Sequence, residues 1–150
     1  MTEPLYDTDF YLWTQTQTAA LRAKDVAALD LEHLAEEIES LGKRDRRAVE
    51  SYLEVILLYL LKWAYQPERR GRSWKKSLLQ ARHRLAKLLR ENPSLANQVP
   101  EFLDEGYPHV RRLAAIETSL PLTAFPETCP WAGGQVLEED FWPEMSGDGA

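Results

Sequence analysis

The chain has 150 residues, of which 44% are hydrophobic and 28% charged, and its formal net charge is −6. This length is typical of one domain, and the hydrophobic content excludes a disordered chain. A single cysteine, Cys129, excludes an internal disulfide framework and a cysteine-rich zinc site. The first ten residues lack a basic start before an apolar stretch, so we expect a cytoplasmic protein of bacterial type. We expect one helical domain over residues 1–145 and a mobile tail over residues 146–150.

The first expected helix begins at Asp7, whose carboxylate is suited to cap it. Its apolar face is expected to carry Tyr6, Phe10, Trp13, Gln17, Ala20 and Leu21, which recur at the 3–4 spacing of one helix face. Aromatic residues at that spacing predict a packed core face. A turn follows, with Asp25 placed to cap a short helical piece.

The second expected helix runs from Asp30, its cap, to Tyr65 and is the longest. Its inner stripe is predicted to begin with Leu31, Leu34, Ile38 and Leu41. Gly42 allows a bend at mid-helix, beyond which the helix is expected to resume with the same period. From Tyr52 to Tyr65 only Glu54 and Lys62 are charged, so this part is expected to be the buried centre of the fold. It is too short to cross a bilayer.

Pro67 is expected to end that helix, and a third helix is expected over about 73–91. On a helical wheel its apolar side carries Trp74, and its outer face is basic.

Asn92 and Pro93 form a cap and first-turn pair, and Pro100 is suited to another first turn. A fourth helix is expected to end near Thr118, with a kink or break at Pro108 because proline lacks the N–H that would bond the carbonyl of Asp104.

Beyond Leu120 the pattern changes to an extended segment. Pro121, Pro126 and Pro130 separate the apolar residues Leu122, Phe125 and Trp131. One or two helical turns are expected over 135–141. The predicted fold class is therefore all-α, a four-helix bundle with this Pro-rich C-terminal segment packed on it.

Charge is sorted along the chain. Residues 69–90 contain nine Lys and Arg and no acid, whereas residues 25–42 contain six acids and no base. So dense a basic segment fits a phosphate-bearing or acidic partner, the acidic helix of the same protein, or plain solvation. The residues expected to form a binding face are Arg69, Arg70, Arg72, Lys76, Arg82, Lys87 and Arg90.

Two further residues invite a chemical interpretation. His33 follows Asp30 at i+3, with Glu36 and Glu37 one turn on, but no second Glu-x-x-His pair completes a di-metal set. We expect a partly exposed His33 whose charged form the neighbouring carboxylates favour. Cys129 is expected to pack as a small hydrophobe in a turn with Trp131. No glycine-rich phosphate loop is present. We expect no catalytic residue, metal or cofactor, although an enzyme centred on His33 or Cys129 stays open.

Four stretches of the sequence are similar to those of a known family. They are YDTDFYLW, LDLEHLAEEIESLGKRDRR, LLKWAYQPERRGRSWKKSLLQAR and LPLTAFPETCPW. In this order and spacing they resemble the bacterial domain-of-unknown-function family 29, from about Tyr6 to Pro143. The resemblance implies a small, single-domain, mostly helical bacterial protein and carries no catalytic residues with it.

The function predicted from these observations is a protein-interaction or regulatory module. Its basic helix face would meet an acidic protein or a second copy of the chain. The alternative is nucleic-acid binding through the same face, which an overall pI of about 5.1 disfavours. A role at a membrane is not expected.

Overall fold

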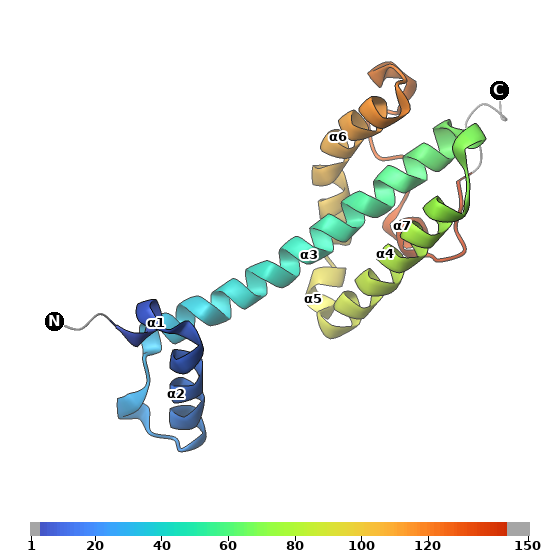
Figure 1. The fold of residues 1–150 in the computed structure, drawn as a ribbon. Coiled ribbons are helices and arrows are strands. Elements are labelled where there is room, and N and C mark those ends of the chain that lie inside the picture. The colour runs from blue at the N-terminus through green and yellow to red at the C-terminus, as the bar shows by residue number, and fades with distance from the viewer. Residues whose placement is uncertain (1–3, 144–150) are drawn as a thin grey trace. The chain divides into compact units, whose positions relative to one another are not determined.

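The computed structural model describes residues 4–143, all of whose regular structure is helical, so the predicted all-α fold class is confirmed (Figure 1). The predicted tail, residues 146–150, lies outside this range. The chain divides into two compact units, Met1–Arg44 (unit 1) and Asp45–Ala150 (unit 2). We describe each unit by itself.

Four helices are long, as predicted. The α-helices are α1 (Leu5–Thr8), α2 (Phe10–Arg22), α3 (Leu31–Tyr65), α4 (Arg72–Glu91), α5 (Pro93–Ala96), α6 (Val99–Thr118) and α7 (Gly133–Leu137). Short 3-10 helices are η1 (Val26–Ala28), η2 (Pro67–Arg69) and η3 (Leu122–Ala124).

Helix α3 has the bounds that the sequence predicts. Asp30 caps it, since its Oδ1 accepts a hydrogen bond of 3.3 Å from the backbone N–H of His33. The helix continues through Gly42 without interruption and ends at Tyr65, two residues before Pro67. One helix therefore supplies residues to both units.

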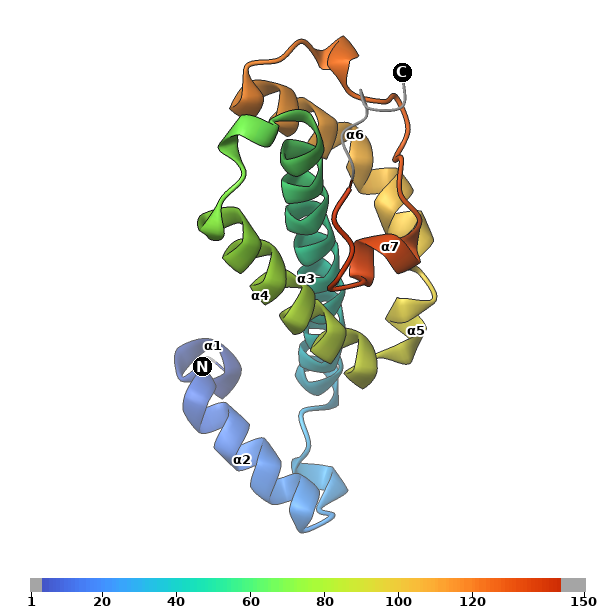
Figure 2. The ribbon, with the colours of Figure 1, turned by 90° about the vertical axis from the view of Figure 1, so that its right-hand side faces the viewer.

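The core of the molecule lies in unit 2. Helices α4 and α6 flank the C-terminal part of α3 on different sides (Figures 1 and 2). The core consists of Val49, Leu53, Ile56, Leu57, Leu60 and Leu61 from α3; Leu78, Ala81, Leu85 and Leu89 from α4; Val99, Phe102, Leu103, Tyr107, Val110 and Ala114 from α6; and Phe125 and Val136. The buried centre that the sequence predicts in α3 is thus observed.

The C-terminal segment packs on this core, as predicted. Phe125 and Val136 are buried, and Cys129, Trp131 and Phe141 pack against the cluster. The Tyr107 hydroxyl donates a 2.7 Å hydrogen bond to the carbonyl of Pro126. The helical turn expected over 135–141 begins two residues earlier, as α7.

Unit 1 buries few side chains. Among its described residues only Trp13, Gln17 and Ala20 are buried, all on α2. The predicted inner stripe of α3 is wrong over its first turns. Leu31, Ile38 and Leu41 are exposed and Leu34 is half-buried. The stripe has the period of a core face, but no described element covers it.

The predicted cap of the first helix is wrong, and so is the predicted break at Pro108. Asp9, not Asp7, caps the first long helix, since its side chain accepts a 3.0 Å hydrogen bond from the N–H of Leu12. Helix α6 continues through Pro108 without a break. Asp104 and Pro108 are both exposed, so water can solvate the carbonyl that proline leaves unbonded.

Candidate interaction surface

Helix α4 presents most of the basic segment to solvent. Its apolar side, with Leu78, Leu85 and Leu89, faces the core, which leaves the opposite side exposed. The exposed basic residues of the segment are Arg69, Arg72, Lys75, Lys76, Arg84, Lys87 and Arg90. We call these seven residues the basic face. Five of the seven residues predicted for the binding face belong to it.

Arg82, which the sequence places in the predicted binding face, does not belong to the basic face. It is 2% exposed and its guanidinium reaches the C-terminal segment. Nε donates to the carbonyl of Val136 (2.9 Å), Nη1 to those of Phe141 (2.9 Å) and Glu139 (3.4 Å), and Nη2 to that of Gln135 (3.2 Å). Burial lowers the pKa of Arg82. Through these hydrogen bonds Arg82 holds the end of α7 and the segment after it against α4.

Arg70 is half-buried and also has a local role. Its Nε donates a 2.8 Å hydrogen bond to the carbonyl of Trp63 in the last turn of α3, and its guanidinium lies 5.0 Å from the centre of the Trp63 ring. Its Nη2 is buried without a hydrogen-bond partner among the described residues. Arg70 therefore stabilises the α3–α4 connection rather than standing free.

The basic face forms no ion pair within the described part of the chain. Within residues 4–143, no carboxylate lies within 4.0 Å of a Lys or Arg nitrogen of the segment 69–90. The acidic segment of unit 1 has, among these residues, the pairs Asp30–His33 and Glu39–Lys43. Within residues 4–143, most carboxylates of the acidic segment and all cations of the basic face therefore have no ion-pair partner.

A groove runs along the basic face between α3 and α4. Two adjoining hollows, of about 320 and 220 Å³, share Tyr52 and Arg84 in their walls. The wall from α3 consists of Ala48, Tyr52, Val55 and Tyr59, and that from α4 includes Gln80, Arg84, Lys87 and Leu88. We call this the α3–α4 groove. Its walls carry apolar side chains, and its rim carries the cations Arg84 and Lys87 together with one acid, Glu91. Two cations against one acid suit an apolar segment with acidic flanks.

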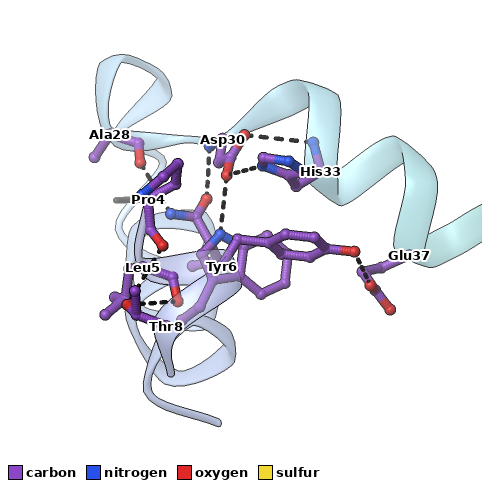
Figure 3. Close-up of polar contacts among 10 residues, drawn as sticks. Pro4, Leu5, Tyr6, Thr8, Ala28, Asp30, His33 and Glu37 are labelled. Carbon is purple, nitrogen blue, oxygen red and sulfur yellow. Dashed lines mark hydrogen bonds and ion pairs between the residues drawn. The ribbon is translucent and has the colours of Figure 1, made fainter. Parts of the chain in front are cut away.

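Unit 1 is organised around Asp30 (Figure 3). Asp30 Oδ2 accepts hydrogen bonds from the indole N–H of Trp13 (3.0 Å) and from Nδ1 of His33 (2.7 Å). The Asp30 backbone N–H donates to the side chain of Gln17 (2.7 Å). The ring of Tyr6 stacks on that of His33, with the centroids 3.9 Å apart, and its hydroxyl donates to Glu37. These bonds join α1 and α2 to the first turns of α3.

The same contacts shift the protonation equilibria of the group. The hydrogen bond to Asp30 raises the pKa of His33, which is 24% exposed. The bond to His33 lowers the pKa of Asp30. The bond to Glu37 raises the pKa of Tyr6 to about 12. His33 is partly exposed and its charged form is favoured, as predicted. Glu37 turns to Tyr6, and Glu36 is exposed.

Cys129 is half-buried in the C-terminal segment, where its Sγ lies 3.4 Å from the carbonyl of Trp131. Burial raises the pKa of the thiol, which disfavours the nucleophilic thiolate. Cys129 packs against the core cluster, as predicted for a small hydrophobe.

Three glutamates, Glu50, Glu54 and Glu105, line a cavity of about 160 Å³ beside Gly106. Arg46 pairs with Glu50 at 3.2 Å and covers the ring of Phe102. Over residues 4–143 there is no group of three or more His, Cys, Asp or Glu placed to hold a metal ion. No helix in the same range is long and apolar enough to span a bilayer.

Sequence reasoning missed two features of these sites. On the helical wheel Arg82 lies roughly 20° from Leu89, which belongs to the apolar side, so the helical period already indicated that Arg82 is buried. The stacking of Tyr6 on His33 joins residues 27 positions apart, and no local pattern predicts it.

Comparison with curated proteins and with solved structures found no match for this chain. The family described as "Domain of unknown function DUF29" matches residues 5–142. The match covers most of the chain, so the chain belongs to the DUF29 family, as the resemblance predicted.

Proposed function

We propose that this protein is an interaction module of the bacterial cytoplasm whose basic face binds an acidic protein surface. The observation that carries the proposal is the basic face itself, seven exposed cations without a carboxylate partner in the part of the chain described. Like charges gathered on one surface repel one another, and a partner of opposite charge relieves that repulsion.

The α3–α4 groove indicates what kind of acidic partner fits. Its walls offer Tyr52, Val55 and Leu88 beside Arg84 and Lys87. Apolar side chains at the centre with charged residues at the rim are typical of protein interfaces. A partner that carries apolar residues flanked by Asp or Glu is therefore favoured.

Nucleic acid is the less favoured ligand. Stacking on bases needs an exposed aromatic ring beside the cations. Trp74, the aromatic residue inside the basic segment, is half-buried, with Tyr59 at its edge and the Lys62 ammonium 4.9 Å from its ring centre. The net charge of −6 also opposes binding to a polyanion.

The test compares capture by the wild-type chain and by a triple variant, Lys76→Glu, Lys87→Glu and Arg90→Glu. All three positions are exposed, so the fold is expected to persist. A matched control, Arg22→Glu, Arg47→Glu and Arg112→Glu, makes the same charge change at exposed positions outside the segment. Bacterial cytosolic extract is passed over each protein at low and high salt, with and without nuclease.

We expect a stoichiometric protein that survives nuclease, is kept by the control and is lost by the triple variant. Equal capture by all three chains would refute a role for the basic face. Capture of nucleic acid alone, lost after nuclease, would replace the proposal with nucleic-acid binding.

A further inference from the structure

The walls of the α3–α4 groove are two helices that run in opposite directions. Ala48 and Glu91 line the hollow of about 320 Å³, and Tyr59 and Ser77 line that of about 220 Å³. The apolar residues of the α3 wall follow the 4–3–4 spacing of one helix face; they are Ala48, Tyr52, Val55 and Tyr59. Val55 is 39% exposed, and the other three are half-buried. An apolar face of α3 is therefore open along the whole groove.

The secondary structure of the walls limits what can lie between them. Both walls are helices, so their backbone N–H and C=O groups are bonded within α3 and α4. An extended peptide in the groove would find no backbone partner for its own N–H and C=O groups, and such groups are costly to bury unbonded. A helix bonds its own backbone groups and presents side chains to the groove. The groove therefore favours a helical ligand.

The extent of the apolar wall sets the length of that helix. From Ala48 to Tyr59 the wall extends about 16 Å along α3, at a rise of about 1.5 Å per residue. At the Tyr59 end, the Lys62 ammonium lies 5.0 Å from the centre of the Tyr59 ring and 4.9 Å from that of Trp74. The apolar surface of the wall thus ends at a cation. A ligand helix of about three turns covers the wall from end to end.

The charges of α4 determine which flank of the ligand helix is acidic. Lys76, Gln80, Arg84, Lys87 and Glu91 follow a 4–4–3–4 spacing, so they form one ridge of α4. All five are exposed, and the last four of them line the groove. Three cations against one acid favour Asp or Glu on the flank of the ligand that faces this ridge.

From these observations we infer that the groove binds an amphipathic α-helix of the acidic partner. This helix is about three turns long, packs apolar residues at 3–4 spacing against Tyr52 and Val55, and carries Asp or Glu along the flank that faces Arg84 and Lys87. The inference rests on the proposed function, because it specifies which element of the acidic partner the chain binds.

The first experiment measures the binding of three synthetic peptides to the full chain by fluorescence anisotropy. The first peptide is an amphipathic helix of about four turns, with Leu at 3–4 spacing and Glu along one flank. The second has a proline at its centre, and the third has Lys in place of Glu. We expect the first peptide to bind, and the second to bind at least about 30-fold more weakly because proline breaks the helix. The third is expected not to bind, because its Lys residues would face cations.

Two variants with matched controls locate this binding. Val55→Asp places a carboxylate on the apolar wall and is expected to weaken binding of the first peptide about 30-fold or more. Ile116→Asp, at a position 75% exposed on α6, is expected to leave it unchanged. Arg84→Glu should weaken binding about 10-fold at low salt, whereas Arg112→Glu, at an exposed position outside the groove, should not. Circular dichroism confirms that each variant keeps its helix content.

The second experiment identifies the segment of the natural partner that lies in the groove. Val55, or Ile116 as the control, is replaced by the photoreactive benzoylphenylalanine, and each protein is irradiated in bacterial cytosolic extract. Mass spectrometry identifies the segment joined to position 55. We expect a segment without proline that has apolar residues at 3–4 spacing and Asp or Glu on one flank. No such product is expected from position 116.

Several results would overturn the inference. They are equal binding of the first two peptides, binding unchanged by Val55→Asp, and no binding of any peptide. A cross-linked segment that contains proline or lacks acids would also overturn it. A wild-type dimer that Val55→Asp dissociates, measured by sedimentation equilibrium, would assign the groove to a second copy instead.

The outcomes also separate this inference from the proposed function. If the inference is overturned and an acidic protein is still captured through the basic face, the proposed function stands. If the first peptide binds in the groove but capture from extract does not depend on the basic face, the proposed function is refuted and the preference of the groove for an acidic helix remains.

Discussion

The two units are stabilised in different ways. Unit 2 has one continuous cluster of eighteen buried apolar side chains drawn from three long helices and the C-terminal segment. Among its described residues, unit 1 buries three side chains and depends on hydrogen bonds that converge on Asp30. Eight of the twelve large apolar side chains that are exposed within residues 4–143 belong to it. Apolar burial contributes about 25 cal/mol per Å², whereas a hydrogen bond adds only about 1 kcal/mol net. Unit 1 should therefore open more readily than unit 2.

The largest change in the relative stability of the two units is expected from Arg82→Met. The change leaves four carbonyls of the C-terminal segment without their donor, and we expect unit 2 to lose about 3–5 kcal/mol. Urea unfolding followed by circular dichroism measures the loss. Arg84→Met, two positions along on the exposed side of α4, should change stability by no more than about 0.5 kcal/mol. Equal losses in both variants would contradict the anchoring role.

A second change is expected to separate the two units. Trp13→Ala removes the largest buried side chain of unit 1 and the donor to Asp30. Hydrogen exchange should become fast over α2 while α4 keeps its protection, because the core of unit 2 contains no residue of α2. Faster exchange over α4 would show instead that the units unfold together.

A smaller effect is expected from the Asp30 carboxylate. Asp30→Ala removes the cap of α3 and the bonds to Trp13 and His33, so exchange over the first turn of α3 and over α2 should rise. Asp30→Asn keeps a capping oxygen but loses the charge opposite His33. We expect its exchange rates between those of wild type and Asp30→Ala. Identical rates in both variants would mean that the charge contributes nothing.

The smallest effect is a pH dependence of unit 1. Folding raises the pKa of His33 above its ordinary 6.5, so its stabilisation is complete below pH 6.5 and is lost as pH rises through the raised pKa. Folding lowers the pKa of Asp30 below 3.8, so its contribution is complete above pH 3.8 and is lost as pH falls through the lowered pKa. Protection of α2 should therefore be greatest between about pH 4 and 6.5.

The groups that face His33 are Asp30, Tyr6 with its bonded Glu37, and the acids Glu32 and Glu36. His33→Gln should abolish the loss of protection on the alkaline side, whereas His83→Gln on the exposed side of α4 should retain it. If the protection of α2 is still lost at alkaline pH in His33→Gln, a group other than His33 causes the loss.

Local chemistry in the sequence predicted much of the fold. Some residues act on the backbone within a few positions, so their effect can be predicted without tertiary information. Examples are Asp30 as a cap, Pro67 after the end of α3 and Pro93 in a first turn. The helical period of the apolar residues in α3 could also be recognised in the sequence. What the period cannot supply is the surface that covers it, which is why the stripe of Leu31, Ile38 and Leu41 was assigned to the core.

The candidate site was predictable to a similar degree. The dense positive charge on α4 follows from composition and helical period, and most of the predicted residues are exposed. The fate of Arg82 depends on carbonyls 53 to 59 residues away, and that of Arg70 on the carbonyl of Trp63. The helical wheel places Arg82 beside the buried Leu89, but the carbonyls that accept from it cannot be identified from the local sequence.

The position of Arg82 in the chain has a consequence for biosynthesis. A ribosome delivers Arg82 well before the last of its acceptors, the carbonyl of Phe141, which follows 59 residues later. Until that residue emerges, the guanidinium has no place in the interior and α4 cannot settle fully on α3. Unit 2 therefore completes its folding only after residue 141 has emerged, whereas the bonds around Asp30 connect residues that emerge earlier.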